Sequence, residues 1–389
     1  MRESTERREI RGYHAVRAAA KDTETYSSDL IGDRDTRTYK QVPLEYDPPR
    51  HTEFREAVSP MFMSQNIEPK TPDFERIARE LIENITARGG GDIARDLALP
   101  YVMACLTVIY NRPQDLEEWI SWGPDVWTAE AYQSGVLGTD GGSDAHALRS
   151  GALLESYLDR VFTAATPTPG ADPASTDVWD WIAGLEIDRR RLTRDEMFGI
   201  ANVLLAGGRD TVITLITGLT WHLVANPSDR RYLLENPSAF HAAISEMVRF
   251  LSPLPAIERV LPEDRGTPMP ERNPGNYVLL NYLSANHDRT IWTDPDVIDI
   301  HRERRPHLAF GFGRHSCMGM NITEFEARAF LTVLLRDWPD WEFEGEPHID
   351  WVIEGAGEDA FRVVERFASV RVRTRSGAQA AAPRVPGQA

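Results

Sequence analysis

The longest apolar region of the chain, Phe198–Ala225, constrains the fold more than any other feature. A segment of this length and period forms a helix that either crosses a membrane or lies inside a large core. Gly207, Gly208, Arg209 and Asp210 stand at its middle, where lipid would tolerate them poorly. We therefore predict a long helix buried inside the protein.

The helical pattern recurs through most of the chain, and strand patterns are few. Helical periodicity occurs over Phe74–Ala87, Gln114–Trp127, Ala145–Ala165, Thr193–Val224, Phe240–Leu251 and Ile322–Arg336. Strand patterns are short and late, at Tyr277–Leu283 and Ala368–Arg373. The predicted fold class is mainly α with small β-sheets.

The length of 389 residues leaves one or two domains open. A helical enzyme of this size can build one continuous core around a buried cofactor, so we expect a single domain over residues 1–375. The stretch Thr166–Ser175 is rich in proline and is expected to be a surface linker between two helices. Residues 376–389, rich in Ala, Gly, Pro and Gln, are expected to form a disordered tail.

Composition and charge narrow the classes of function. With 41% hydrophobic and 26% charged residues, the chain has the composition of a folded, water-soluble protein. The formal net charge of −17 disfavours binding to nucleic acid or to an anionic membrane, because phosphate repels an acidic surface. Cys105 and Cys317 stand far apart and Met1–Ile10 is charged, so we expect no disulfide, no signal peptide and no membrane anchor. A cytoplasmic protein follows.

Cys317 stands in an unusual loop. The segment from Phe310 to Gly319 reads FGFGRHSCMG and precedes a periodic helix. Gly311, Gly313 and Gly319 let the backbone approach a flat ligand closely. The positive end of the helix dipole and amide hydrogen bonds would stabilise a thiolate here. The alternative for an isolated cysteine is a reduced structural residue in a turn, and the flanking pattern decides against it.

This segment resembles the haem-binding signature of the cytochrome P450 family, Phe-x-x-Gly-x-His-x-Cys-x-Gly, which is highly specific. The resemblance extends over nearly the whole chain from about Tyr13. It implies the cytochrome P450 fold, heme b as the cofactor and Cys317 as the axial ligand of the iron, with Phe310, Gly311 and Gly319 around the haem. A thiolate ligand favours O–O cleavage, so the implied activity is that of a monooxygenase.

Two further segments match the family in the expected order. Ala206–Thr211 resembles the oxygen-binding kink of the family, in which Asp210 and Thr211 would relay protons. Glu246 and Arg249 resemble its Glu-x-x-Arg pair, which implies a buried structural role. Without the cysteine loop, Ala206–Thr211 would indicate an ordinary helix bend with a solvated Arg–Asp pair. The Glu246 and Arg249 pair would then indicate an ion pair on the surface.

Haem carries two propionates, whose burial requires charged or hydrogen-bonding partners. By resemblance, His51 and Arg55 supply them from a helix at the haem edge. Arg259 and His307 stand where the family places further propionate contacts. Solvated surface charge is the alternative for each of these residues. We also expect an apolar substrate pocket, with walls from Val203, Ala206, Gly207, Leu254, Ala256 and Ile257.

The implied reaction inserts one oxygen atom from O2 into a small, largely apolar organic substrate. Electrons would come from a ferredoxin and its NAD(P)H-dependent ferredoxin reductase. Near the cysteine loop, the four arginines 302, 304, 305 and 314 stand against a single acid, Glu303, in an otherwise acidic chain. This imbalance predicts a basic surface that attracts an acidic ferredoxin.

Two other functions remain as alternatives. A peroxide-driven haem-thiolate enzyme usually has Arg-Pro in place of the acid-alcohol pair, and no proline follows Arg209 here. A non-catalytic haem-thiolate ligand-binding protein would need no proton relay and no electron donor. Asp210 and Thr211 favour the oxygen-dependent enzyme over both.

The resemblance is incomplete at the beginning. Family members carry a further helix and the first sheet strands before this point, and His51 arrives early by comparison. Either the start site was assigned too far downstream or the fold lacks this edge of the sheet. We favour the first, because a missing edge would expose unpaired strand groups and apolar surface. Asn273–Asn276 stands where the family has a Pro-Ala-Gly turn, and we expect a turn there too.

Overall fold

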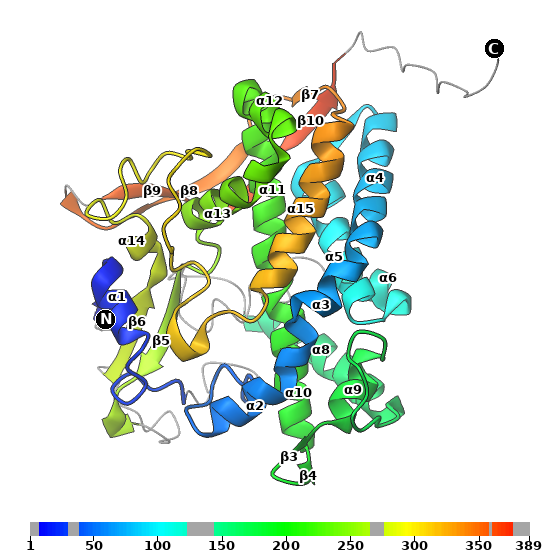
Figure 1. Cartoon of the computed structure of the whole chain (residues 1–389), viewed down its shortest axis with the longest axis vertical. Coiled ribbons are helices and arrows are strands. Elements are labelled where there is room, and N and C mark those ends of the chain that lie inside the picture. The colour runs from blue at the N-terminus through cyan, green and yellow to red at the C-terminus, as the bar shows by residue number, and fades with distance from the viewer. Residues whose placement is uncertain (1–7, 30–38, 123–143, 265–275, 358–359, 376–389) are drawn as a thin grey trace, which may run out of the picture.

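The computed structural model describes residues 8–29, 39–122, 144–264, 276–357 and 360–375, with the backbone alone over 144–152. Helices dominate and the sheets are small, which confirms the predicted fold class (Figure 1). The helices are α1 (Tyr13–Ala19), α2 (Arg50–Val58), α3 (Ser64–Ile67), α4 (Thr71–Ala87), α5 (Leu99–Ile109), α6 (Leu116–Ser121), α8 (Asp144–Ala164), α9 (Val178–Gly184), α10 (Arg194–Gly207), α11 (Asp210–Ala225), α12 (Pro227–Glu235), α13 (Phe240–Leu251), α14 (Tyr282–Asn286) and α15 (Met320–Arg336). The strands are β1 (Arg8–Ile10), β2 (Gly90–Asp92), β3 (Glu186–Ile187), β4 (Arg190–Arg191), β5 (Ala256–Val260), β6 (Tyr277–Asn281), β7 (Trp341–Phe343), β8 (His348–Glu354), β9 (Phe361–Ser369) and β10 (Arg371–Thr374).

Several predicted helices form with nearly the expected bounds. Helix α13 matches its prediction to the residue, and α4, α8 and α15 differ from theirs by three residues or fewer at either end. The prediction for residues 114–127 is met by α6 only in part, and residues 123–127 lie outside the described ranges. The expected linker Thr166–Ser175 lies between α8 and α9.

The long apolar region folds as two helices and not as one. A capping box at Thr193 and Glu196 starts α10, which ends at Gly207. Helix α11 starts at Asp210, and Arg209 between the two helices has a ψ of −81°. The Thr211 hydroxyl donates a hydrogen bond to the Gly207 carbonyl at 3.0 Å. At the break, this carbonyl therefore accepts a hydrogen bond from a side chain.

The strands form small separate sheets. Strand β6 is central in the order β1-β6-β5, parallel to β1 and antiparallel to β5. The predicted strand Tyr277–Leu283 ends two residues early, because the Asn281 side chain accepts a hydrogen bond from the Ser284 amide and caps α14. The prediction for Ala368–Arg373 is divided between β9 and β10.

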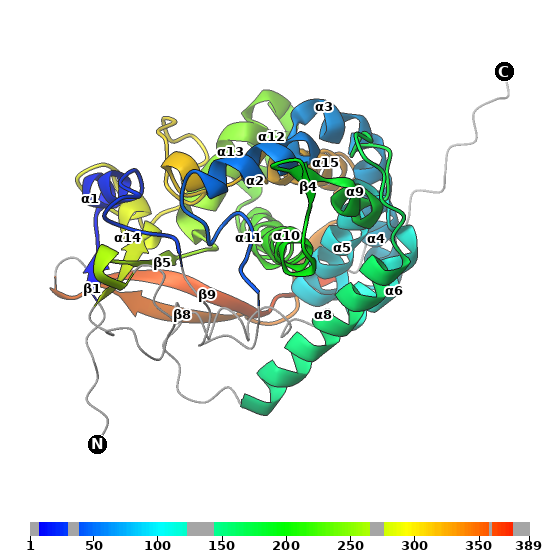
Figure 2. The same ribbon diagram turned by 90° about the horizontal axis from the view of Figure 1, so that it is seen from below.

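The core surrounds the central helices. Figure 2 shows α10 and α11 nearly end-on in the middle of the molecule, with the β8–β9 hairpin along one side. One large apolar cluster runs through the chain from Tyr39 to Val372. A smaller cluster joins α1 to β6 and α14. The expected tail 376–389 and residues 273–275 of the expected turn lie outside the described residues.

The region Arg194–Ala225 is long and apolar enough to cross a membrane by length and composition. In this structure 56% of its most apolar window is buried inside the protein, and the break at Gly208 and Arg209 divides it. These are the features of a core helix, as predicted from the charged residues at its middle.

Candidate functional site

The loop before α15 holds Cys317 at the helix start. The Cys317 amide donates to the Phe310 carbonyl at 2.8 Å, which closes the loop on itself. Gly311 and Gly313 have φ angles of 67° and 75°, in the left-handed region that favours glycine. A Cβ atom on Gly313 would lie 2.8 Å from the Ala20 carbonyl oxygen, so glycine also permits the contact between this loop and the end of α1.

The thiol of Cys317 is accessible at this site. Enough protein surrounds it that desolvation raises its pKa, whereas the Gly319 amide, the Arg55 charge and the Met320 amide lower it. Amide hydrogen bonds to sulfur, together with a cation, are the environment that stabilises a thiolate as a metal ligand. Cys105 differs, because it is fully buried and desolvation raises its pKa well above the usual value.

Two histidines and two arginines gather beside the thiol. His51 and Arg55 are one turn apart on α2, and the His51 ring centroid lies 4.1 Å from that of His315 in the cysteine loop. Burial, followed by the charges of Arg55 and Arg314, lowers the pKa of His51 to about 4. Burial, followed by the charge of Arg259 on β5, lowers the pKa of His315 to about 2.

Among the described residues, Asp47 is an acid whose charge acts on His51 and Arg259 in this cluster. Arg259 is only 4% exposed, and its Nη1 donates a hydrogen bond to the Glu258 carbonyl. Neither ring nitrogen of His51 has a hydrogen-bond partner among the described residues. The nearby Asp47 accepts hydrogen bonds from Ser27 and Ser28. A buried guanidinium is costly without an anion, so these residues fit a ligand that brings carboxylates next to Cys317. Haem would fit this donor set: Cys317 would hold its iron, and the arginines and histidines would hold its propionates.

The propionate contact predicted at His307 stays a prediction. The charges that act on His307 are those of Arg249, Glu246 and Arg304, and burial lowers its pKa to about 4. None of these three residues is one of the cations beside Cys317. His315, two residues before the cysteine, is the histidine that contacts His51. It was not among the predicted propionate contacts, although the signature motif contains it.

Glu246 and Arg249 form the expected pair in the interior. Their side chains are 5% and 1% exposed, and two Arg249 nitrogens lie 2.8 Å from the Glu246 carboxylate. Arg302 adds a third member, with Nε 3.0 Å from the same carboxylate. This corrects the prediction that Arg302 belongs to a basic surface, because its other donors bind backbone carbonyls of residues 293, 294 and 297.

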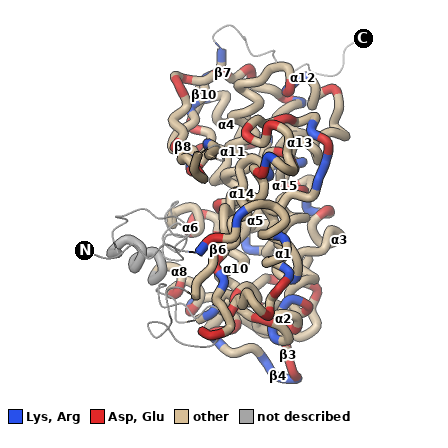
Figure 3. The backbone as a smooth tube through the Cα atoms, turned by 90° about the vertical axis from the view of Figure 1, so that its left-hand side faces the viewer, with Lys and Arg blue, Asp and Glu red and all other residues tan. Residues whose placement is uncertain are grey.

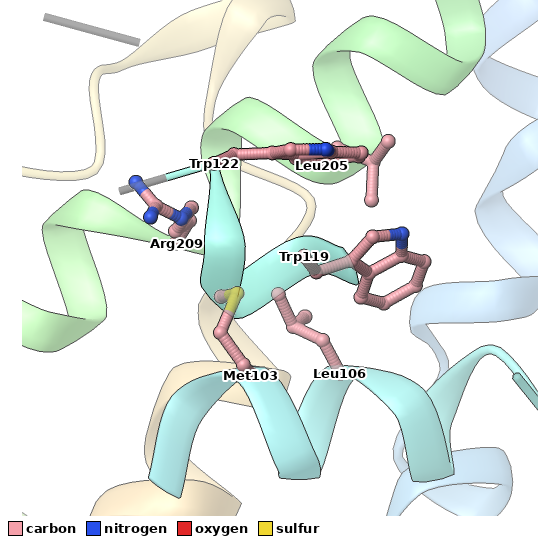
Figure 4. A pocket seen from close by; sticks show the side chains of 6 residues that line it. All are labelled: Met103, Leu106, Trp119, Trp122, Leu205 and Arg209. Carbon is pink, nitrogen blue, oxygen red and sulfur yellow. The ribbon is translucent and has the colours of Figure 1, made fainter. Parts of the chain in front are cut away.

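The helix break presents Asp210 and Thr211 in the first turn of α11. Asp210 pairs with Arg209, with Nη1 and Oδ1 2.8 Å apart. A Cβ atom on Gly207 would meet nothing within 4 Å, so open space adjoins the break. Figure 4 shows Arg209 next to Trp122 and Leu205.

The expected pocket residues occupy different environments. Val203 and Ala206 are half-buried on α10, and Gly207 is exposed next to open space. Leu254 is 41% exposed, whereas Ala256 on β5 is buried. Ile257 contacts the smaller apolar cluster around α1 and β6, so it is grouped with that side of the molecule. Their shared role as pocket walls stays a prediction.

Comparisons with known proteins agree with this geometry. The family profile "Cytochrome P450" matches residues 238–347, which include Glu246, Arg249, Arg259 and the cysteine loop. "Cytochrome P450 130" of Mycobacterium tuberculosis is 30% identical over 351 residues, covering 86% of this chain and 82% of that protein. "Steroid C26-monooxygenase" of the same species is 28% identical over 329 residues, covering 84% and 86%.

A solved structure gives the same result for the fold. The structure described as "a carbohydrate active P450" superposes with a TM-score of 0.77 and 27% sequence identity. The match covers 94% of this chain and 91% of that one. The arrangement of helices and small sheets is therefore shared along nearly the whole length.

Proposed function

This chain belongs to the cytochrome P450 family of haem-dependent monooxygenases, and we propose that it oxidises a small, largely apolar substrate with electrons from a ferredoxin. The observation that carries this proposal is the grouping of an accessible Cys317 thiol with Arg55, Arg259, His51 and His315. Cys317 would hold the iron through its sulfur, and the four cationic or hydrogen-bonding side chains would hold the propionates.

The reaction consumes a substrate C–H bond, one O2, two electrons and two protons, and it yields a C–OH bond and one water. Bound haem supplies the activation of oxygen. The protons would pass through the chain, and we infer that Asp210 and Thr211 move them from the accessible edge of the helix break to the reaction site. Apolar walls at Val203 and Ala206 would keep other water away.

Isotope labelling tests the oxygen-dependent reaction. The purified enzyme, supplied with NADPH, a ferredoxin and its reductase, should incorporate one atom from labelled O2 into a product. The substrate is found first by its effect on the iron spin state in a panel of steroids, macrolides, fatty acids and sugars, since relatives are named for steroid and carbohydrate chemistry. Product formation with hydrogen peroxide alone, and none with the ferredoxin system, would favour the peroxide-driven alternative. No product under either condition would favour a ligand-binding protein.

The proposed docking surface for the ferredoxin lies around Phe312. The guanidinium of Arg17 on α1 and the ammonium of Lys21 just after this helix lie 4.5 Å and 5.3 Å from the centre of the Phe312 ring. Arg304, shortly before the cysteine loop in the sequence, and Arg314, within this loop, are both exposed. Acidic and basic stretches are both scattered along the backbone in the view of Figure 3. A surface with several cations is therefore a local feature that would attract an acidic donor.

Charge reversal tests this surface. Lys21→Glu combined with Arg304→Glu should slow reduction by an acidic ferredoxin and flatten its dependence on ionic strength, because steering depends on these charges. Arg366→Glu, on an exposed part of β9, is the matched control and should leave the rate unchanged. Stopped-flow reduction at several salt concentrations measures both. Equal rates for the wild type and the double variant would discard the surface.

A further inference from the structure

Arg209 is among the most deeply buried cations of the described chain. Only 2% of its side chain is exposed. Arg209 lines a small cavity together with five apolar or aromatic residues, and it lies at one side of that group (Figure 4): Met103, Leu106, Trp119, Trp122 and Leu205. A guanidinium in such surroundings loses hydration worth several kcal/mol unless an anion or other polar groups offset the loss. An ionic contact of Arg209 offsets part of this loss.

The anion that contacts Arg209 is the next residue, Asp210. Nη1 of Arg209 lies 2.8 Å from Oδ1 of Asp210, while the Asp210 side chain is 37% exposed. The pair thus spans the boundary between the apolar interior and the accessible edge of the helix break. Close packing fixes the arginine, so the ion pair sets the position of the carboxylate.

We propose that Arg209 is a positioning residue that holds the Asp210 carboxylate beside Thr211 for proton delivery. This inference rests on the proposed roles of Asp210 and Thr211. The Thr211 hydroxyl is already held by the Gly207 carbonyl at 3.0 Å, and Arg209 gives the neighbouring carboxylate a comparable anchor.

Loss of the anchor has a measurable chemical consequence. Each productive turnover uses two electrons and two protons to make product and one water from O2. When protons are not delivered to the correct oxygen atom, the same two electrons and two protons leave with O2 as hydrogen peroxide. The ratio of product to peroxide therefore reports on the position of the carboxylate, whereas haem content and substrate binding do not.

The central variant is Arg209→Met, because methionine suits the apolar surroundings and apolar replacement of a buried ion often preserves stability. Product formed per NADPH consumed should fall by about tenfold, as a small misplacement at an active site commonly costs this much or more, and peroxide should rise in proportion. Arg209→Lys keeps the charge and should recover most of the product. Arg289→Met, which breaks a surface pair with Asp296, should change nothing. Arg209→Gln replaces the methionine variant if the latter does not assemble with haem.

A double-mutant cycle with Asp210→Asn separates the possible outcomes. If Arg209 acts through Asp210, the double variant should couple electrons to product as Asp210→Asn does, and urea unfolding of the four proteins should show non-additive stabilities. If the double variant instead loses coupling by the product of the two single losses, the positioning role of Arg209 is overturned while the proton relay stands. Wild-type coupling in Asp210→Asn would overturn the proposed relay itself. The reduced carbon monoxide spectrum and the substrate-induced spin shift, measured on each variant, show that the site has assembled.

Discussion

At the scale of single residues, the Thr211 hydroxyl has the most specific expected role. Thr211→Ala removes the hydrogen bond to the Gly207 carbonyl and the proton donor at the break, so product formation should fall by roughly 100-fold, the lower end of general acid–base effects. Electron consumption should continue, with hydrogen peroxide as the product. Thr217→Ala is a matched control, because Thr217 makes the same type of bond to the Ile213 carbonyl on the same helix. Equal coupling in Thr211→Ala and the wild type would remove Thr211 from the mechanism.

The cations at the proposed propionate site were only partly predictable from sequence. His51, Arg55 and Arg259 are grouped in the structure as the resemblance implied. His307 and His315 both precede the cysteine, and we predicted only His307, because the sequence does not show which residue a loop turns toward the other cations. In the structure His315 contacts His51 and the Ser28 hydroxyl, whereas the propionate role of His307 stays a prediction.

At the scale of elements, the contact between the cysteine loop and α1 depends on Gly313. Gly313→Ala places a Cβ atom 2.8 Å from the Ala20 carbonyl and strains a φ of +75°, so the free energy of unfolding should fall by at least about 1 kcal/mol and haem should bind more weakly. Gly345→Ala is the matched control, since it has a φ of +82° but no neighbour within 4 Å.

Urea unfolding and the haem-to-protein ratio measure the two effects. The backbone strain is common to both variants, whereas the clash belongs to Gly313→Ala alone. Equal haem content in the two variants would contradict a role for this contact in shaping the site.

Amphipathic helices were the elements that sequence predicted best. The apolar face of α13 is regular, and its predicted bounds were correct. Helix α5 was not predicted, because it is apolar nearly all round and buried, so it has little periodicity to detect. We expected a kink between α10 and α11, and the structure has two separate helices there. The side chains of Thr211 and Arg209 make contacts at this break that a sequence pattern does not specify.

At the scale of the whole molecule, one carboxyl group in the core makes stability depend on pH. Glu326 on α15 is fully buried, and neither of its carboxyl oxygens has a hydrogen-bond partner among the described residues. Desolvation raises its pKa well above the usual value. The folded protein therefore keeps a proton that the unfolded chain loses above its own, lower pKa, and folding stability falls as pH rises between the two values.

Glu326→Gln should abolish this dependence. At acidic pH, where the carboxyl is neutral in both states, the variant and the wild type should be similarly stable. Above the pKa of the carboxyl in the unfolded chain, the free energy of unfolding of the variant should exceed that of the wild type by up to about 1.4 kcal/mol more for each pH unit. This increase should stop where the carboxyl of the folded wild type also ionises. Glu80→Gln, at an exposed position of α4, is the control and should follow the wild type. Urea unfolding across pH measures the slopes, and identical slopes for Glu326→Gln and the wild type would contradict a neutral buried carboxyl.

The central claim, that Cys317 is the axial ligand of a haem held by this fold, is tested most directly by the absorption spectrum of the reduced carbon monoxide complex. The purified wild-type protein should absorb where thiolate-ligated haem does. Cys317→His should shift this band to the position of imidazole-ligated haem if it retains haem, while Cys105→Ala, which removes the other cysteine, should keep the wild-type band. A thiolate-type spectrum in Cys317→His, or an imidazole-type spectrum in the wild type, would contradict the assignment.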